Sequence, residues 1–218
     1  MKDLSVSQSY LICALNESGK LPALSVESPV CILAGGLIDL IFAKSVAIGE
    51  DKRLCITDEL GEESLYLSSL YTFIKESKPI NVETLASEYA FTFSDKRLKL
   101  LIKDVGTSLV SLGYATTENV GRLGKTPCFI PDTNIVDNVI QNIRAELLEN
   151  GTVSDNIIAL VSLMDKSNQI KKYFSKYEKN ELKVRLKEIK DNPSNKLAKE
   201  MVDYIDTLIA VIAVAGSH

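Results

Sequence analysis

Few side chains in this sequence could carry hydrolytic or metal chemistry. The single histidine, His218, is the last of 218 residues. Nucleophilic catalysis needs a nucleophile, an adjacent base and usually a group that orients the base. With no internal histidine, only lysines and carboxylates remain as bases, and no motif places one beside a serine or cysteine. We therefore expect no enzymatic activity, no bound metal and no cofactor.

The four cysteines offer no convincing zinc site, which would need four well-placed ligands. None belongs to a C-x-x-C pair, and each lies in an apolar run, as small buried hydrophobic residues do. We expect buried, reduced thiols and a reducing, cytoplasmic compartment. They are Cys13, Cys31, Cys55 and Cys128.

Glycines and acidic residues also have structural explanations. Gly35-Gly36 lies inside a helical pattern and Gly121-x-x-Gly124 in a predicted hairpin tip, so neither resembles a phosphate-binding loop between strand and helix. The helix dipole favours carboxylates at a helix start. It accounts for the acidic group Asp58, Glu59, Glu62 and Glu63.

The distribution of basic residues is more informative. The segment 94–131 carries a net charge of +3 in a chain whose net charge is −4. Exposed cations could contact anionic lipid or a phosphorylated headgroup. The order short helix, turn, longer helix, hairpin also fits a winged helix-turn-helix that binds DNA, although the net charge argues against nucleic acid. A solvated helix face is the third interpretation. The cations are Lys96, Arg97, Lys99, Lys103, Arg122 and Lys125.

Hydrophobic spacing predicts a mainly α fold, a single compact helical domain over residues 1–215. One or two small β-hairpins are expected, at 46–56 and at 114–131, and the second is expected to protrude. Residues 216–218 are interpreted as a tail, compatible with a cloning remnant. Helices are predicted at 7–15, 28–44, 63–77, 82–89, 94–112, 132–149, 154–164, 170–174 and 178–190, with a last one starting at 194.

Neither of the two most apolar segments is long enough to cross a membrane. Residues 29–43 number fifteen and include Asp39, and 208–215 number eight, whereas a spanning helix needs roughly 20 residues. No secretory signal is evident at the start of the sequence. Membrane association is therefore expected to be peripheral.

Several stretches, taken in order, resemble the Golgi phosphoprotein 3 family. They cover the chain from about residue 4 to 215, and the ordered set is more specific than any one motif. The matching stretches are Leu4-Ser5-Val6-Ser7-Gln8-Ser9-Tyr10-Leu11, Ala34-Gly35-Gly36-Leu37-Ile38-Asp39-Leu40, Ser108-Leu109-Val110-Ser111-Leu112-Gly113-Tyr114, Asn156-Ile157-Ile158-Ala159-Leu160-Val161 and Ile205-Asp206-Thr207-Leu208-Ile209-Ala210.

This resemblance implies a helical domain with a protruding hairpin, through which members self-associate into homo-oligomers. It also implies a peripheral membrane adaptor on the cytosolic face, at the Golgi if the source is eukaryotic. Such adaptors bind phosphatidylinositol 4-phosphate and the tails of other proteins. The hairpin tip would then use Val120 and Leu123 for membrane or subunit contact.

Four positions of this sequence align with the residues that line the family's headgroup pocket, and only one of these positions holds a charged residue. A tryptophan and three basic residues line that pocket in the family, whereas this chain has no tryptophan. Lys99 is the expected headgroup ligand, and the other five cations form the expected basic surface. The remaining pocket positions are Leu24, Leu33 and Ile102.

Overall fold

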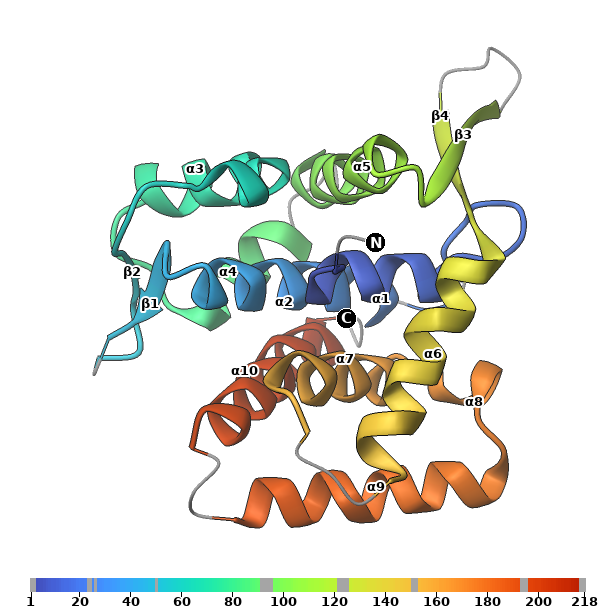
Figure 1. Cartoon of the computed structure of the whole chain (residues 1–218). Helices are drawn as coiled ribbons and strands as arrows, with labels where there is room; N and C mark the ends of the chain where they lie inside the picture. The colour runs from blue at the N-terminus through green and yellow to red at the C-terminus, as the bar shows by residue number, and fades with distance from the viewer. Residues whose placement is uncertain are drawn as a thin grey trace.

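Two buried helices form the centre of the protein. The computed structural model describes residues 3–22, 25, 27–49, 51–90, 96–120, 126–149, 153–192 and 196–215. Helices α1 (Val6–Ala14) and α2 (Glu27–Phe42) lie side by side in the middle of the molecule (Figure 1). A Cβ on Gly35 would come within 3.0 Å of the Ser7 backbone, so the absent side chain allows the two helices to approach closely.

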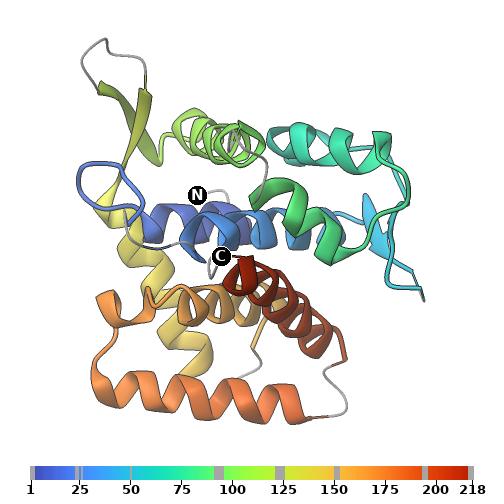
Figure 2. The same cartoon turned by 180° about the vertical axis from the view of Figure 1, so that it is seen from behind.

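Other helices cover this central pair from two sides. Figures 1 and 2 show α3 and α5 on one side and α7 and α10 on the other, with α9 farthest from α5 and α6 along one edge. The elements on the α5 side are η1 (Glu62–Leu67), α3 (Ser68–Glu76) and α5 (Lys96–Ser111), whereas α4 (Val82–Ala90) lies beside α2 and packs mainly against α10. The remaining helices are α6 (Thr133–Leu147), α7 (Asp155–Lys166), α8 (Ile170–Tyr173), α9 (Lys176–Asp191) and α10 (Lys196–Ala215).

Two antiparallel hairpins complete the fold. Strands β1 (Val46–Ile48) and β2 (Leu54–Ile56) pair in the order predicted. Strands β3 (Ala115–Val120) and β4 (Thr126–Pro131) pair with Thr117 opposite Phe129, and this hairpin projects beyond α5 (Figure 1).

A buried aromatic ring fixes the base of the projecting hairpin. Phe129 is buried, and its ring occupies the space that a Cβ on Gly106 of α5 would need. The Phe129 backbone likewise lies 2.8 Å from where a Cβ on Gly19 would be, and the φ of Gly19 is +67°. Close packing of this kind leaves no room for another methyl group, so the hairpin is held to the body by core packing.

The predicted fold class is confirmed: the chain is mainly helical with two small two-stranded sheets. The helix expected to begin at Asp132 is capped there, since the Asp132 side chain accepts a backbone N–H group at the start of α6, and the Ser154 side chain does the same at the start of α7. One buried apolar cluster joins residues from Val6 to Leu208.

Two sequence predictions need correction. The helix expected at 63–77 begins as a 3₁₀ helix, η1, and becomes α-helical only at Ser68, because Leu67 leaves the helical region with φ −99° and ψ 10°. Cys55 is exposed, because it points away from the core on the short β2 strand, while Cys13, Cys31 and Cys128 are buried as expected. All four cysteines are free thiols.

Within the described part of the chain, no helix is both long and apolar enough to span a membrane.

Candidate functional site

A buried carboxylate joins α1 to α2 at the floor of a large hollow in the protein surface. Asp39 of α2 is 6% exposed. Its oxygens accept the backbone N–H groups of Val6 at 2.8 Å and Ser7 at 3.0 Å, and the hydroxyl of Ser5 at 2.8 Å. The first N–H groups of a helix have no partner within the helix. Asp39 therefore supplies acceptors to the N-terminus of α1 from a neighbouring helix.

Tyr66 extends this network to η1. Its hydroxyl lies 2.7 Å from Ser5 Oγ and 3.1 Å from Asp39 Oδ2. Burial raises the pKa of the Asp39 carboxyl, and hydrogen bonds from Ser7 and Ser5 oppose that shift. Burial, followed by the charge of Asp39, raises the pKa of the Tyr66 hydroxyl well above its ordinary value. Desolvation disfavours the charged form of each group.

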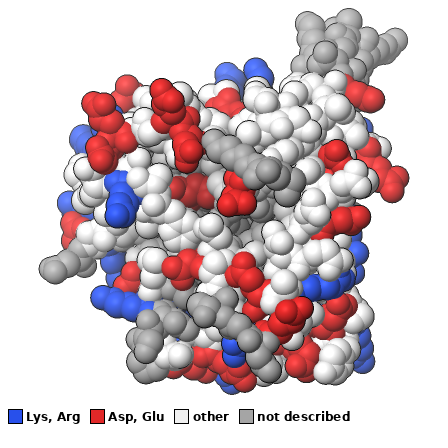
Figure 3. All heavy atoms as spheres, in the orientation of Figure 1, with Lys and Arg blue, Asp and Glu red and all other residues white. Residues whose placement is uncertain are grey.

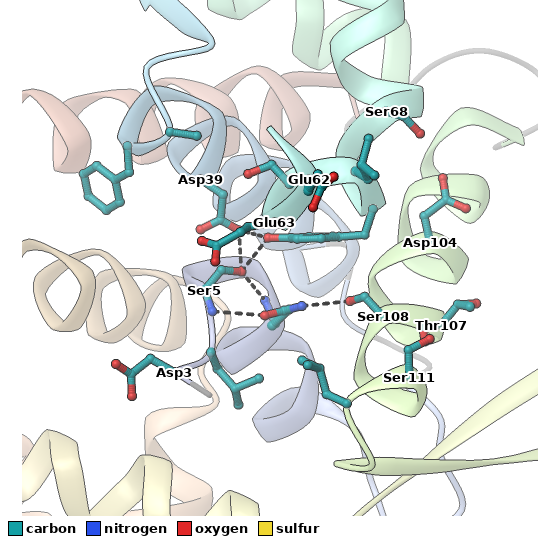
Figure 4. Close-up of a pocket in the computed structure, with 18 of the residues that line it drawn as sticks. Asp3, Ser5, Asp39, Glu62, Glu63, Ser68, Asp104, Thr107, Ser108 and Ser111 are labelled. Atoms are coloured by element: carbon teal, nitrogen blue, oxygen red, sulfur yellow. Dashed lines mark hydrogen bonds between the residues drawn. The ribbon is translucent and has the colours of Figure 1, made fainter. Parts of the chain in front are cut away.

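A second polar link connects α1 with α5. The backbone N–H of Ser5 donates to Gln8 Oε1 at 3.1 Å, and Gln8 Nε2 donates to Ser108 Oγ at 2.9 Å. The Ser108 hydroxyl in turn donates to the Val105 carbonyl at 2.7 Å. Figure 4 shows this chain of hydrogen bonds crossing the floor of the hollow. The floor is therefore held in place by four elements, α1, α2, η1 and α5.

The hollow, which we call the carboxylate pocket, has a volume of about 880 Å³. Ligand sites in proteins usually measure roughly 300–1,000 Å³. Five carboxylates and one ammonium, that of Lys103, line it. The carboxylates belong to Asp3, Asp39, Glu62, Glu63 and Asp104.

These carboxylates reach the pocket from different elements. Figure 4 shows that Glu62 and Glu63 come from η1 and that Asp104 comes from α5. The hydroxyl of Ser69, in α3, donates to Asp104 Oδ2 at 2.8 Å. Acidic side chains also gather around the central hollow in Figure 3, while the cations visible on that face lie mostly nearer its edges. A pocket lined in this way favours a cationic group, such as an ammonium or guanidinium, over an anion.

The cationic residues of α5 divide into two groups. Lys96, Lys99 and Lys103 are exposed and spaced three and four residues apart, so they share one face of the helix, which we call the lysine face. Arg97 is also exposed but pairs with Glu88 at 3.0 Å and stacks over the Phe73 ring at 4.7 Å. The Arg97 guanidinium therefore interacts with side chains of α3 and α4.

The predicted headgroup positions that the structure describes do not line the carboxylate pocket. Leu33 is 1% exposed in the core, Ile102 is half-buried, and neither lines the carboxylate pocket, nor does Lys99. Val120 ends β3 opposite Thr126. The predictions for Leu24, Arg122, Leu123 and Lys125 fall outside the described residues.

The carboxylate pocket itself was not predicted. Glu62 and Glu63 were explained as acids at a helix start, which they also are. The sequence signal for this site is Asp39, a charged residue within an apolar helix. A buried charge needs polar partners, so such a residue indicates a polar site inside the fold. Among the residues described, no three His, Cys, Asp or Glu side chains are placed to hold a metal ion.

The fold and site define a helical binding domain with a hollowed acidic face, a cationic helix face and a projecting hairpin. The model of the Golgi phosphoprotein 3 (GPP34) family matches residues 6–206, and the chain belongs to this family. The family consists of non-enzymatic adaptors that associate peripherally with the Golgi. No curated protein matches the sequence.

Proposed function

We propose that this protein is a non-enzymatic, peripheral adaptor that binds anionic membrane through α5 and holds the cationic tail of a membrane protein in the carboxylate pocket. The observation that carries the membrane part is the lysine face: Lys96, Lys99 and Lys103 are exposed on one side of a single helix. Family membership supports the same role.

The expected lipid affinity is modest and electrostatic. A cation near an anionic leaflet contributes about 1 kcal/mol, so the lysine face would supply about 3 kcal/mol. Screening by salt would weaken it. Because Leu33 is buried and Ile102 is apolar, a phosphate placed there would lack partners. We therefore expect little selectivity for phosphatidylinositol 4-phosphate over other anionic lipids.

The tail-binding part of the proposal comes from the position of the carboxylate pocket. Lys103 and Asp104 are consecutive in α5, and both line the pocket, so cationic and anionic surfaces meet along this helix. A tail that leaves the membrane beside α5 would find carboxylates immediately next to the lipid contact. Lysines or arginines in that tail would form charge-assisted hydrogen bonds with Glu62, Glu63 and Asp104.

Vesicle flotation tests the membrane part. The triple variant Lys96→Glu, Lys99→Glu and Lys103→Glu should lose binding to phosphatidylcholine vesicles that contain phosphatidylserine. The matched variant Lys171→Glu, Lys176→Glu and Lys187→Glu changes the net charge equally at exposed lysines of α8 and α9 and should still bind. Vesicles of equal charge with phosphatidylinositol 4-phosphate should bind similarly.

Unchanged flotation of the lysine-face variant would refute the membrane part. A mobility shift with duplex DNA at physiological salt, with no binding to vesicles, would instead favour the winged-helix interpretation. Loss of binding by both triple variants would mean that net charge, not the lysine face, is responsible.

Peptide binding tests the tail part. A fluorescein-labelled arginine-rich peptide should bind to the protein in solution, and Glu62→Gln with Glu63→Gln should weaken binding by about tenfold, the usual worth of a charge-assisted contact. Glu83→Gln, at an exposed glutamate of α4, is the control. Equal affinity of the pocket variant and the wild type would contradict the tail part alone.

Self-association through the hairpin is also part of the proposal, since hairpin edges seek partner strands. The variant Val120→Ser with Leu123→Ser should shift the sedimentation coefficient towards the monomer. An unchanged oligomeric state would rule out the hairpin tip as the subunit contact.

A further inference from the structure

A second, smaller hollow lies on the other side of the segment that precedes α1. Its volume is about 290 Å³, and it shares Asp3, Leu4, Ser5 and Asn156 with the carboxylate pocket. The two hollows are therefore neighbours, separated by residues 3–5. Its lining combines apolar side chains, two carboxylates (Asp3 and Glu146) and neutral hydrogen-bonding side chains that include asparagines of α6 and α7, and we call it the amide pocket.

One hydroxyl that lines the amide pocket makes no hydrogen bond to the residues that the structure describes. It belongs to Ser9 of α1, which is 7% exposed. Other helical serines donate to a carbonyl of their own helix: Ser87 to Glu83 at 2.9 Å and Ser162 to Ile158 at 2.7 Å. The Ser9 hydroxyl makes no such bond and faces the space of the pocket instead of being enclosed by protein atoms. The Ser9 hydroxyl is therefore available to a group in the pocket.

Two asparagines form the opposite wall. Asn138 and Asn142 are four residues apart on α6, so their side chains share one face of the helix, and both line the pocket. A carboxamide both donates and accepts hydrogen bonds, which is what a peptide unit also does. Glu146, one turn further along α6, is engaged, because its Oε2 accepts the backbone N–H of Ser154 at 2.7 Å.

We propose that the amide pocket binds the main chain of an extended peptide whose lysine or arginine side chains enter the adjacent carboxylate pocket. This inference rests on the proposed function, because the peptide is the same cationic tail. Charge selects the occupant: the five carboxylates next door require a cation, while the neutral groups of the amide pocket match peptide N–H and C=O groups. The peptide crosses residues 3–5 between the two pockets.

A backbone-modified peptide tests this proposal. The probe is a fluorescein-labelled peptide of alternating arginine and alanine, compared with the same peptide N-methylated at each alanine. Methylation removes main-chain donors and keeps every charge. We expect the wild-type protein to bind the methylated peptide about fivefold to tenfold more weakly, as for one or two lost hydrogen bonds.

Variants of the amide pocket provide the second measurement. Ser9→Ala and Asn142→Ala should each weaken binding of the unmodified peptide about threefold to tenfold. Each should also reduce the further loss caused by methylation, as expected for coupled partners in a double-mutant cycle. Asn134→Ala, an exposed asparagine one turn earlier on α6 and outside the pocket lining, is the control. Thermal unfolding checks that each variant is folded.

The outcomes separate this inference from the proposed function. Equal binding of the methylated and unmodified peptides, or unchanged binding by Ser9→Ala and Asn142→Ala, overturns the amide pocket as a main-chain site. If binding in that case still depends on Glu62 and Glu63, the tail part of the proposed function stands. No binding of either peptide to the wild type overturns both, and vesicle flotation then tests the membrane part alone.

Discussion

Of the carboxylates that meet a helix N-terminus in the described part of the chain, Asp39 and Glu178 differ most in their surroundings: one lies inside the core and the other near the surface. Asp39 reaches α1 from another helix and is buried. Glu178 lies in the first turn of its own helix, α9, where it accepts the backbone N–H of Ser175 at 2.7 Å and the Arg144 Nε–H at 2.9 Å. The chemistry of the contacts is alike, but their surroundings differ.

The surroundings decide the direction of each pKa shift. Burial raises the pKa of Asp39 because the surrounding protein removes most of the solvation that stabilises a carboxylate, and in the described part of the chain no cation is bonded to it. The hydrogen bond from Arg144 lowers the pKa of Glu178 to about 2. A helix N-terminus therefore does not guarantee an acidic carboxyl; access to water and to a cation matters more.

The largest effect is expected for the buried carboxylate. Asp39→Ala leaves the N–H groups of Val6 and Ser7 buried without an acceptor, at roughly 1–3 kcal/mol each. We expect the free energy of unfolding, measured with urea, to fall by about 3 kcal/mol. The control Asp58→Ala, at an exposed carboxylate, should change it by less than about 0.5 kcal/mol. Similar values for the two would show that burial is not the deciding difference.

A smaller loss is expected at α9. Glu178→Gln keeps acceptor oxygen for Ser175 but removes the charge that pairs with Arg144. Because this pair is partly exposed, we expect the variant to lose about 1 kcal/mol in the same urea experiment. A loss as large as that of Asp39→Ala would erase the contrast between the two sites.

Acidification should affect the two sites in opposite ways. The stability that Glu178 contributes is present above its ordinary pKa of 4.5 and is lost as the pH falls towards about 2. Asp39 has a raised pKa, so its contribution is present below the ordinary value of 3.8 and decreases as the pH rises through the folded value. Urea unfolding over an acidic pH series should show this difference. Relative to wild type, the free energy of unfolding of Glu178→Gln should increase as the pH falls, whereas that of Asp39→Asn should increase as the pH rises. Parallel curves for both variants and the wild type would contradict this.

The smallest effect is expected for a surface ion pair that makes no contact with a helix N-terminus. Lys183 and Asp165 join α9 to α7 at 3.3 Å, with the lysine more than half exposed. Surface pairs contribute roughly 0–1 kcal/mol, so Lys183→Ala should change the unfolding free energy by about 0.5 kcal/mol or less. High salt should abolish even that difference, and a salt-independent loss would indicate packing by the lysine stem instead.

The sequence predicted the fold well because its signals are local. Helical spacing, the Asp132 cap of α6 and the β-forming residues of the hairpin at 114–131 each depend on residues close in the chain. Errors occurred where tertiary contacts decide. The 3₁₀ turns of η1 place Tyr66 beside Asp39, 27 residues away, and nothing near Tyr66 in the sequence indicates that partner.

The site was harder to predict than the fold. The lysine face follows directly from spacing on one helix, whereas the carboxylate pocket combines acids from the segment before α1 and from α2, η1 and α5. Each acid has an ordinary local explanation, and only their convergence is informative. Ser9 gave no signal at all, because a serine in an apolar helix usually bonds to its own backbone.

The seating of Phe129 against Gly106 has a consequence for how the hairpin can change. Since the ring occupies the space that any side chain at position 106 would need, strands β3 and β4 leave the body in a direction dictated by the interior. The connection between Val120 and Thr126 can therefore change in length or composition while the paired strand ends at Val120 and Thr126 keep their positions. Related proteins can therefore carry different contact residues between these two strands without any change in the core of the domain.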